Sequence, residues 1–131
     1  MRREELMIGD WVIAQPDEDI CGEGIGTIVD RITEIYDVEG VMSVSLDDFD
    51  YPVAVGLLEP LRMTEEMLEK NLATFQPISW CIGWNKPDDI HIEIKNEDLI
   101  GSFYGTCNYV HELQHALRLC KFDKQADDFK L

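Results

Sequence analysis

Short apolar runs separated by turn residues make up the first sixty positions of the chain. The runs cover residues 6–15, 24–36, 41–46 and 53–61. The third run, VMSVSL, places Met42, Val44 and Leu46 on one face, and this period of two is typical of a strand with one buried side. Gly40 precedes this run and Asp47–Asp48 follows it, as turn residues do. The pattern predicts a small antiparallel β-meander or barrel.

Two short motifs in this region add a resemblance. GDWV at residues 9–12, followed by GTIV at 26–29, resembles the opening of SH3-like barrels, in which a Gly-Asp turn precedes the first core strand. The resemblance implies that residues 1–62 form a β-rich, SH3-like lobe. Trp11, Trp80 and Trp84 are expected in the core, since exposed tryptophans would instead indicate a binding surface.

A helix is predicted directly after this lobe. Thr64 is a favourable N-cap, and Glu65 and Glu66 fall in the first turn, where the helix dipole favours negative charge. Pro77 ends any continuation of this helix. The apolar stripe of the helix consists of Met63, Met67, Leu68 and Leu72.

The remainder of the chain predicts strands followed by a second helix. Alternation in IHIEI at residues 90–94 indicates one buried face, so residues 78–106 are expected to form an antiparallel sheet packed on one side. Asn108 is the expected N-cap of a helix over residues 108–120, and the polar ending KFDKQADDFKL is expected to fray. The fold class is therefore α+β. Its second lobe covers residues 63–131 and either shares one core with the first or folds separately.

Composition restricts the function of the chain. It carries 27 acidic and 11 basic residues, for a formal charge of −16. Nucleic-acid phosphates and anionic membranes would repel such a chain, so we expect neither as a partner. The charge suits a basic partner protein or forms a solvated surface. We expect a monomer or a small homo-oligomer.

Localisation is inferred from the N-terminus and the cysteines. The opening MRREELMIGDW has no apolar stretch of the kind found in a secretory signal. The four cysteines, Cys21, Cys81, Cys107 and Cys120, form no C-x-x-C pair. We therefore expect reduced thiols and a cytoplasmic location.

Residues 111–115 read HELQH, which matches the H-E-x-x-H pattern of zinc hydrolases. On a helix, His111 and His115 lie on one face and can bind one zinc ion, while Glu112 would take the proton of the metal-bound water. Such a site needs a third protein ligand. The candidates are Cys107, His91, Asp123, Asp127 and Asp128.

The helical wheel gives the motif a second interpretation. Val110, Leu113 and Leu117 form the apolar arc of the helix, and both histidines fall away from it together with Gln114 and Arg118. The histidines therefore either line a cleft or face water. A pattern with three fixed positions also arises by chance in ordinary amphipathic helices.

Three segments carry a further resemblance. ELMIGDWV at residues 5–12, EPLRMTEEMLEKN at 59–71 and YVHELQHALRL at 109–119 are similar in sequence and order to a group of short uncharacterised proteins of gut bacteria and their phages or mobile elements. The chain departs from that group in having Met63 before Thr64 and in lacking the Leu-Thr-Gly that often ends the helix. Members often have Gln and Asn where this chain has Glu112 and His115. The resemblance thus implies packing or partner binding, not catalysis, for Tyr109, Val110, Leu113 and Gln114.

Three functions follow as hypotheses. The first is a non-enzymatic accessory protein without a cofactor that acts through contacts with a protein partner. The second is a small zinc-dependent hydrolase or peptidase that uses His111, Glu112 and His115. The third is an acidic decoy for a basic nucleic-acid-binding protein, which a clustered acidic surface would support.

Overall fold

The computed structural model describes residues 1–15, 26–83, 86–96 and 101–131, which form two compact units, Met1–Leu61 and Arg62–Leu131. The first unit contains a five-stranded antiparallel sheet. The second combines a three-stranded antiparallel sheet with helices, so the predicted α+β class is confirmed. None of the helices in these ranges is both long enough and apolar enough to cross a membrane.

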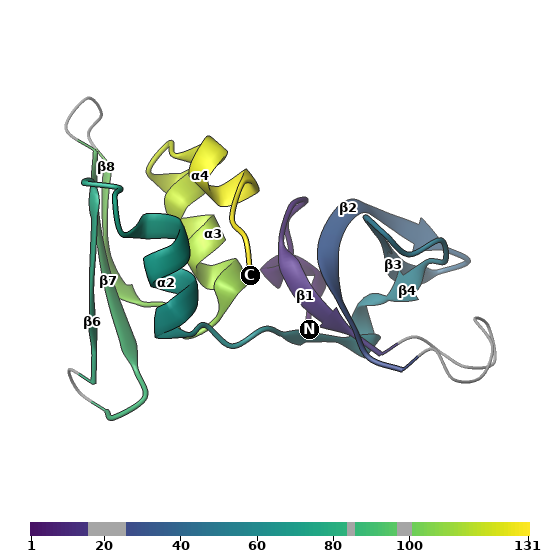
Figure 1. The fold of residues 1–131 in the computed structure, drawn as a ribbon. Coiled ribbons are helices and arrows are strands. Elements are labelled where there is room, and N and C mark those ends of the chain that lie inside the picture. The colour runs from purple at the N-terminus through teal and green to yellow at the C-terminus, as the bar shows by residue number, and fades with distance from the viewer. Residues whose placement is uncertain (16–25, 84–85, 97–100) are drawn as a thin grey trace. The chain divides into compact units, whose positions relative to one another are not determined.

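The N-terminal unit is a meander whose last strand returns beside the first (Figure 1). Its elements are η1 (Arg3–Glu5), β1 (Trp11–Ala14), β2 (Ile28–Val38), β3 (Val41–Leu46), β4 (Val53–Ala54), η2 (Val55–Leu57) and β5 (Leu58–Pro60). The strand order is β4-β3-β2-β1-β5. No ladder among the described residues joins β4 to β5, so the sheet is open and does not form the closed barrel considered from the sequence.

Tight turns and one apolar face hold this unit together. Glu39 and Gly40 both have positive φ, 51° and 84°, which matches the twist of a two-residue hairpin between β2 and β3. Asp37 Oδ1 accepts the Gly40 N–H at 2.7 Å and fixes this turn. The buried core of the sheet consists of Leu6, Val12, Ala14, Ile32, Val44, Leu46, Val53, Val55 and Leu58.

The C-terminal unit has two layers. Its elements are α2 (Glu65–Leu72), β6 (Ile78–Ile82), β7 (Ile90–Asn96), β8 (Gly101–Thr106), α3 (Val110–Leu119) and α4 (Asp123–Asp127). The sheet order is β6-β7-β8, and Figure 1 shows α2, α3 and α4 on the same side of the sheet. Ile90, Ile92 and Ile94 are buried, as the alternation in IHIEI predicted. The Thr64 cap is also confirmed, because its Oγ1 accepts the Met67 N–H at 3.2 Å.

The predicted start of the last long helix is wrong by one residue. Tyr109 is the N-cap of α3. The Asn108 side chain is used elsewhere: its Oδ1 accepts the Ile90 N–H at 2.9 Å, and its Nδ2 donates to Asp89 Oδ1 at 3.0 Å. Asn108 therefore fixes the start of β7 instead of capping the helix.

The expectation that the polar ending frays is also wrong. Residues Asp123–Asp127 form α4, and Ala126 and Phe129 are buried. Asn71 of α2 holds the end of the chain, since its Oδ1 accepts the Lys130 N–H at 2.7 Å and its Nδ2 donates to the Lys130 carbonyl at 2.6 Å. The burial of Ala126 and Phe129 and the hydrogen bonds of Asn71 together anchor a segment that is otherwise polar.

Candidate functional site

The two histidines of HELQH lie one turn apart on α3, and their ring centroids are 5.5 Å apart. The rings meet edge to face at 81°. His111 is buried and also stacks on Tyr109, with 6.2 Å between the two ring centroids, whereas His115 is half-buried. The helix thus brings the two predicted metal ligands together, as their spacing indicated.

Glu112 makes a contact that its place in the H-E-x-x-H pattern does not predict. Its Oε1 accepts the backbone N–H groups of Asn108 and Tyr109, both at 3.1 Å. These donors lie at the start of α3 and have no partner within the helix, so a carboxylate there satisfies them and interacts favourably with the helix dipole. The residue predicted to be a general base therefore stabilises the helix N-terminus in this structure.

The helical wheel did not predict the burial of this helix. His111 and Gln114 were expected to line a cleft or face water, yet both are buried. For Gln114 the cause is α4, because Gln114 Nε2 donates to the Ala126 carbonyl at 3.0 Å. The short C-terminal helix covers the side of α3 that the wheel left open, which corrects that expectation.

The structure does not gather the proposed third ligands around the histidines. In the part of the chain that the structure describes, three potential ligand atoms lie within 4.8 Å of one another at Asp30, Asp47 and Asp48, and no such group includes His111 or His115. Asp127 contacts Arg118 instead, at 3.4 Å, and the His91 ring packs on Tyr104. Asp123 and Asp128 are exposed.

Cys107, another candidate ligand, is buried at the end of β8. Burial raises the pKa of this thiol to about 12, and the negative charge of Glu112 adds to the shift. The Cys107 thiol therefore holds its proton at neutral pH, and a metal ion would have to displace that proton to bind here. Burial also raises the pKa of Cys120, whereas Cys81 is exposed and Cys21 lies outside the described residues.

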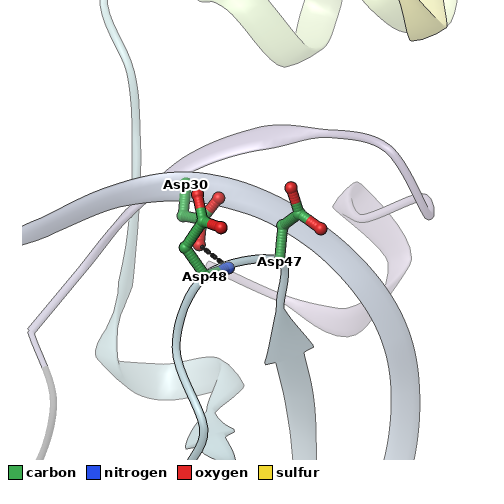
Figure 2. Close-up of side chains that lie close together, drawn as sticks. All are labelled: Asp30, Asp47 and Asp48. Carbon is green, nitrogen blue, oxygen red and sulfur yellow. Dashed lines mark hydrogen bonds between the residues drawn. The ribbon is translucent and has the colours of Figure 1, made fainter.

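The aspartate cluster of the N-terminal unit is held together by backbone contacts (Figure 2). Asp30 is buried, its Oδ1 accepts the Arg31 N–H at 2.7 Å, and its Oδ2 accepts the Asp48 N–H at 2.7 Å. Asp47 and Asp48 are exposed, which agrees with their predicted turn. Asp30 thus anchors the turn that follows β3. The sequence signal for this role of Asp30 is a single acidic residue at an inward-facing position of an apolar strand.

Trp11 does not lie in the core of the unit. It is half-buried and points to the outer face of the sheet, opposite Arg31 in the β1–β2 ladder. The Arg31 guanidinium lies over the indole ring, with its central carbon 5.2 Å from the ring centroid. Trp80 of β6 is half-buried, and Trp84 lies outside the described residues. The outer position of Trp11 corrects its predicted place in the core.

The acidic charge is divided unequally between the two units. Residues 1–61 contain 15 acidic and 3 basic residues, a net charge of −12. Residues 62–131 contain 12 acidic and 8 basic residues, a net charge of −4. The acidic character of the chain is therefore concentrated in the N-terminal unit, which has no lysine.

The C-terminal unit also has a concave region of about 530 Å³. Gln76, Ser79, Lys95 and Phe122 lie among its lining residues. Several polar groups there already pair with protein: Lys95 Nζ lies 2.9 Å from Glu93 Oε1, and Asn96 Nδ2 donates to the Cys120 carbonyl at 2.9 Å. None of the residues predicted as catalytic or metal-binding lines this region.

Comparisons with protein-family models, with curated proteins and with solved structures found no match to the chain.

Proposed function

We propose that this chain is a non-catalytic accessory protein that binds a basic partner protein, mainly through its N-terminal unit. The observation that carries the proposal is the net charge of −12 on residues 1–61 against −4 on residues 62–131. Like charges within one small unit repel each other and oppose compactness. A partner with the opposite charge offsets that repulsion on binding.

The charge of the N-terminal unit is largely available to a partner. Its exposed acidic residues in the described part of the chain are Glu4, Glu34, Asp37, Glu39, Asp47, Asp48, Asp50 and Glu59. A surface of one sign attracts a partner of the other sign over a distance of about one Debye length, roughly 8 Å at physiological salt. Such attraction mainly raises the association rate and selects against acidic partners.

The partner of this proposal is a protein and not a nucleic acid, because phosphates would be repelled by the same surface. A decoy is one form of the proposed function. In that form the acidic unit occupies a basic surface that would otherwise bind nucleic acid.

The structure of the HELQH helix is consistent with a non-catalytic role. Glu112 satisfies backbone donors at the helix start, and Gln114 bonds to the Ala126 carbonyl of α4. Both residues of the motif therefore contribute to folding. Partner binding does not require them to leave these contacts.

One experiment tests the proposal with matched charge variants. Proteins captured by the immobilised chain at low salt are purified, and their affinity for the chain is measured by titration with purified components. The test variant combines Asp47→Asn, Asp48→Asn and Asp50→Asn. The control combines Glu66→Gln, Glu69→Gln and Asp88→Asn, which removes the same charge from exposed positions of the C-terminal unit.

We expect a basic partner whose affinity falls in the test variant more than in the control. We also expect the affinity to fall at an ionic strength of about 0.5 M, where the Debye length is roughly 4 Å. The proposal would be contradicted if the wild type, the test variant and the control bound the partner with equal affinity, or if that affinity did not depend on salt.

The alternative function, a zinc-dependent hydrolase, is favoured by the 5.5 Å between the ring centroids of His111 and His115. In that case the two histidines would hold the ion, and Glu112 would act as a base through the carboxylate oxygen other than Oε1, which accepts the N–H groups of Asn108 and Tyr109. Stoichiometric zinc that is lost in a His115→Ala variant would be the signature of this function.

A further inference from the structure

Strand β1 is apolar on both of its faces. Val12 and Ala14 point inward and are fully buried in the core of the N-terminal unit. Trp11 and Ile13 alternate with them and therefore point outward, where both are half-buried. In antiparallel sheets with one wet face, the outward positions are usually polar. A strand with large apolar residues on both sides is typical of a sheet that is covered on both sides.

The neighbouring strands extend this apolar surface. In the β1–β2 ladder Val29 lies opposite Ile13 and Arg31 lies opposite Trp11, and in the β1–β5 ladder Glu59 lies opposite Ile13. Residues directly opposite in an antiparallel pair share one face of the sheet. Val29 is 43% exposed, a high value for a valine in a central strand of the sheet. We call the surface formed by Trp11, Ile13, Val29 and Arg31 the Trp11 face.

Arg31 and Trp11 contact each other on this face. The guanidinium lies 5.2 Å from the indole centroid, a distance at which a cation–π interaction holds both side chains. Tryptophan and arginine are the residue types most enriched at the energetic centres of protein interfaces. Because the pair is already ordered, less side-chain entropy is lost when a partner binds.

We propose that the Trp11 face is the contact surface for the basic partner protein, which has apolar side chains at the centre of its own surface and Lys or Arg around them. This inference rests on the proposed function and adds the location of the interface. The centre is apolar because Trp11, Ile13 and Val29 form it. Glu59 places an acidic group beside Ile13, and the rest of the unit carries only two further basic residues, Arg2 and Arg3, against 15 acidic residues.

Charge argues against a second copy of the chain as the occupant. Two N-terminal units facing each other would bring together two net charges of −12, and like charges across an interface oppose association. A basic partner gains from the same charges. The apolar centre and the acidic surroundings therefore favour the same occupant.

Two synthetic peptides serve as probes of the full chain. One alternates Lys and Leu, and the other alternates Lys and Ser at the same length and charge. The test variant is Val29→Gln and the matched control is Val41→Gln, since Val41 is an exposed valine of β3 in the same sheet but outside the Trp11 face. Neither substitution changes the charge. Binding is followed by titration and by the NMR signal of the Trp11 indole, which a Trp11→Phe variant assigns.

We expect the Lys–Leu peptide to bind the wild-type chain more tightly than the Lys–Ser peptide and to shift the Trp11 indole signal. Val29→Gln should weaken the binding of the Lys–Leu peptide about tenfold, because the new amide is desolvated without a partner. Val41→Gln should leave this binding unchanged. Both variants should bind the Lys–Ser peptide as the wild type does.

Different results would contradict the location of the interface and the basic character of the partner. Equal binding of the Lys–Leu peptide to both variants, with no shift of the Trp11 signal, would overturn the Trp11 face while leaving a basic partner in place. Failure of both peptides to bind would overturn the basic partner as well. Self-association of the wild-type chain that Val29→Gln abolishes would assign the face to a second copy and overturn the occupant proposed.

Discussion

The carboxylate of Glu112 accepts the backbone N–H of Tyr109 at 3.1 Å at the first turn of α3. The same oxygen accepts the Asn108 N–H, so one side chain satisfies two donors that have no partner inside the helix. This contact gives a structural role to the glutamate of HELQH, and it can be tested apart from any activity.

Glu112→Ala is expected to destabilise the chain by about 1 kcal/mol, since it removes a capping carboxylate from the helix N-terminus. The measurement is the free energy of unfolding from urea titration monitored by circular dichroism. Glu69→Ala is the control, because Glu69 is an exposed residue of α2 and its loss should change stability by about 0.5 kcal/mol or less. Equal effects of the two substitutions would mean that the Glu112 contact does not stabilise the helix.

The raised pKa of the buried Cys107 thiol leads us to expect that the folded chain loses stability at alkaline pH. Its pKa is about 12 in the folded chain and 9.0 for an ordinary thiol, so the unfolded chain loses this proton first. As pH rises from 9.0 to about 12, the Cys107 contribution to the free energy of unfolding should decrease by roughly 1.4 kcal/mol per pH unit. A Cys107→Ala variant, which lacks the thiol, isolates this contribution from other groups that titrate in the same range. Parallel pH profiles of the two proteins would contradict the assignment.

The same burial predicts that the cysteines differ in reactivity. Cys81 is exposed, whereas Cys107 is buried and holds its proton at neutral pH. Alkylation of the folded chain at pH 8, followed by peptide mapping, should label Cys81 at least tenfold faster than Cys107, a difference of the order expected for a buried neutral thiol. Denaturation should remove the difference. Rapid labelling of Cys107 in the folded chain would show that β8 opens readily.

Zinc content separates the proposed function from its alternative. If the chain binds a partner without catalysis, protein purified without chelator should contain much less than one zinc per chain, and dialysis against zinc should not change this. Elemental analysis of the wild type and of His115→Ala measures the content directly. Stoichiometric zinc in the wild type that the variant lacks would make the hydrolase the leading function and call for a peptidase screen.

A substitution at Phe129 tests whether the polar C-terminal segment KFDKQADDFKL is part of the fold. The side chain is fully buried, so Phe129→Ala should destabilise the chain by about 3–5 kcal/mol through lost apolar burial and the cavity left behind. Leu119→Ala is the control, because Leu119 is an exposed residue at the end of α3. Urea denaturation compares the two. A small effect at Phe129 would mean that the last residues contribute little to the C-terminal unit.

Much of the fold followed from local patterns in the sequence. Alternation in IHIEI located the buried face of β7, and Thr64 marked the start of α2. Gly40 marked the β2–β3 turn, because a positive φ there suits glycine. Each of these features depends on residues a few positions apart, so the sequence alone was enough to determine them. The spacing of His111 and His115 is local in the same sense, and the two rings do lie together.

The environment of these residues was decided by tertiary structure. Gln114 is buried because α4 packs on α3, and nothing in the periodicity of residues 108–120 indicates that a charged ending would supply this cover. Asp30 anchors a turn eighteen residues away, and Trp11 lies outside the core because the strand parity already fills the inner face with Val12 and Ala14. A sequence pattern gives the direction of a side chain relative to its own helix or strand. Which segment covers that side chain depends on long-range packing, and therefore only the structure located the acidic unit's outer face and the cover over Gln114.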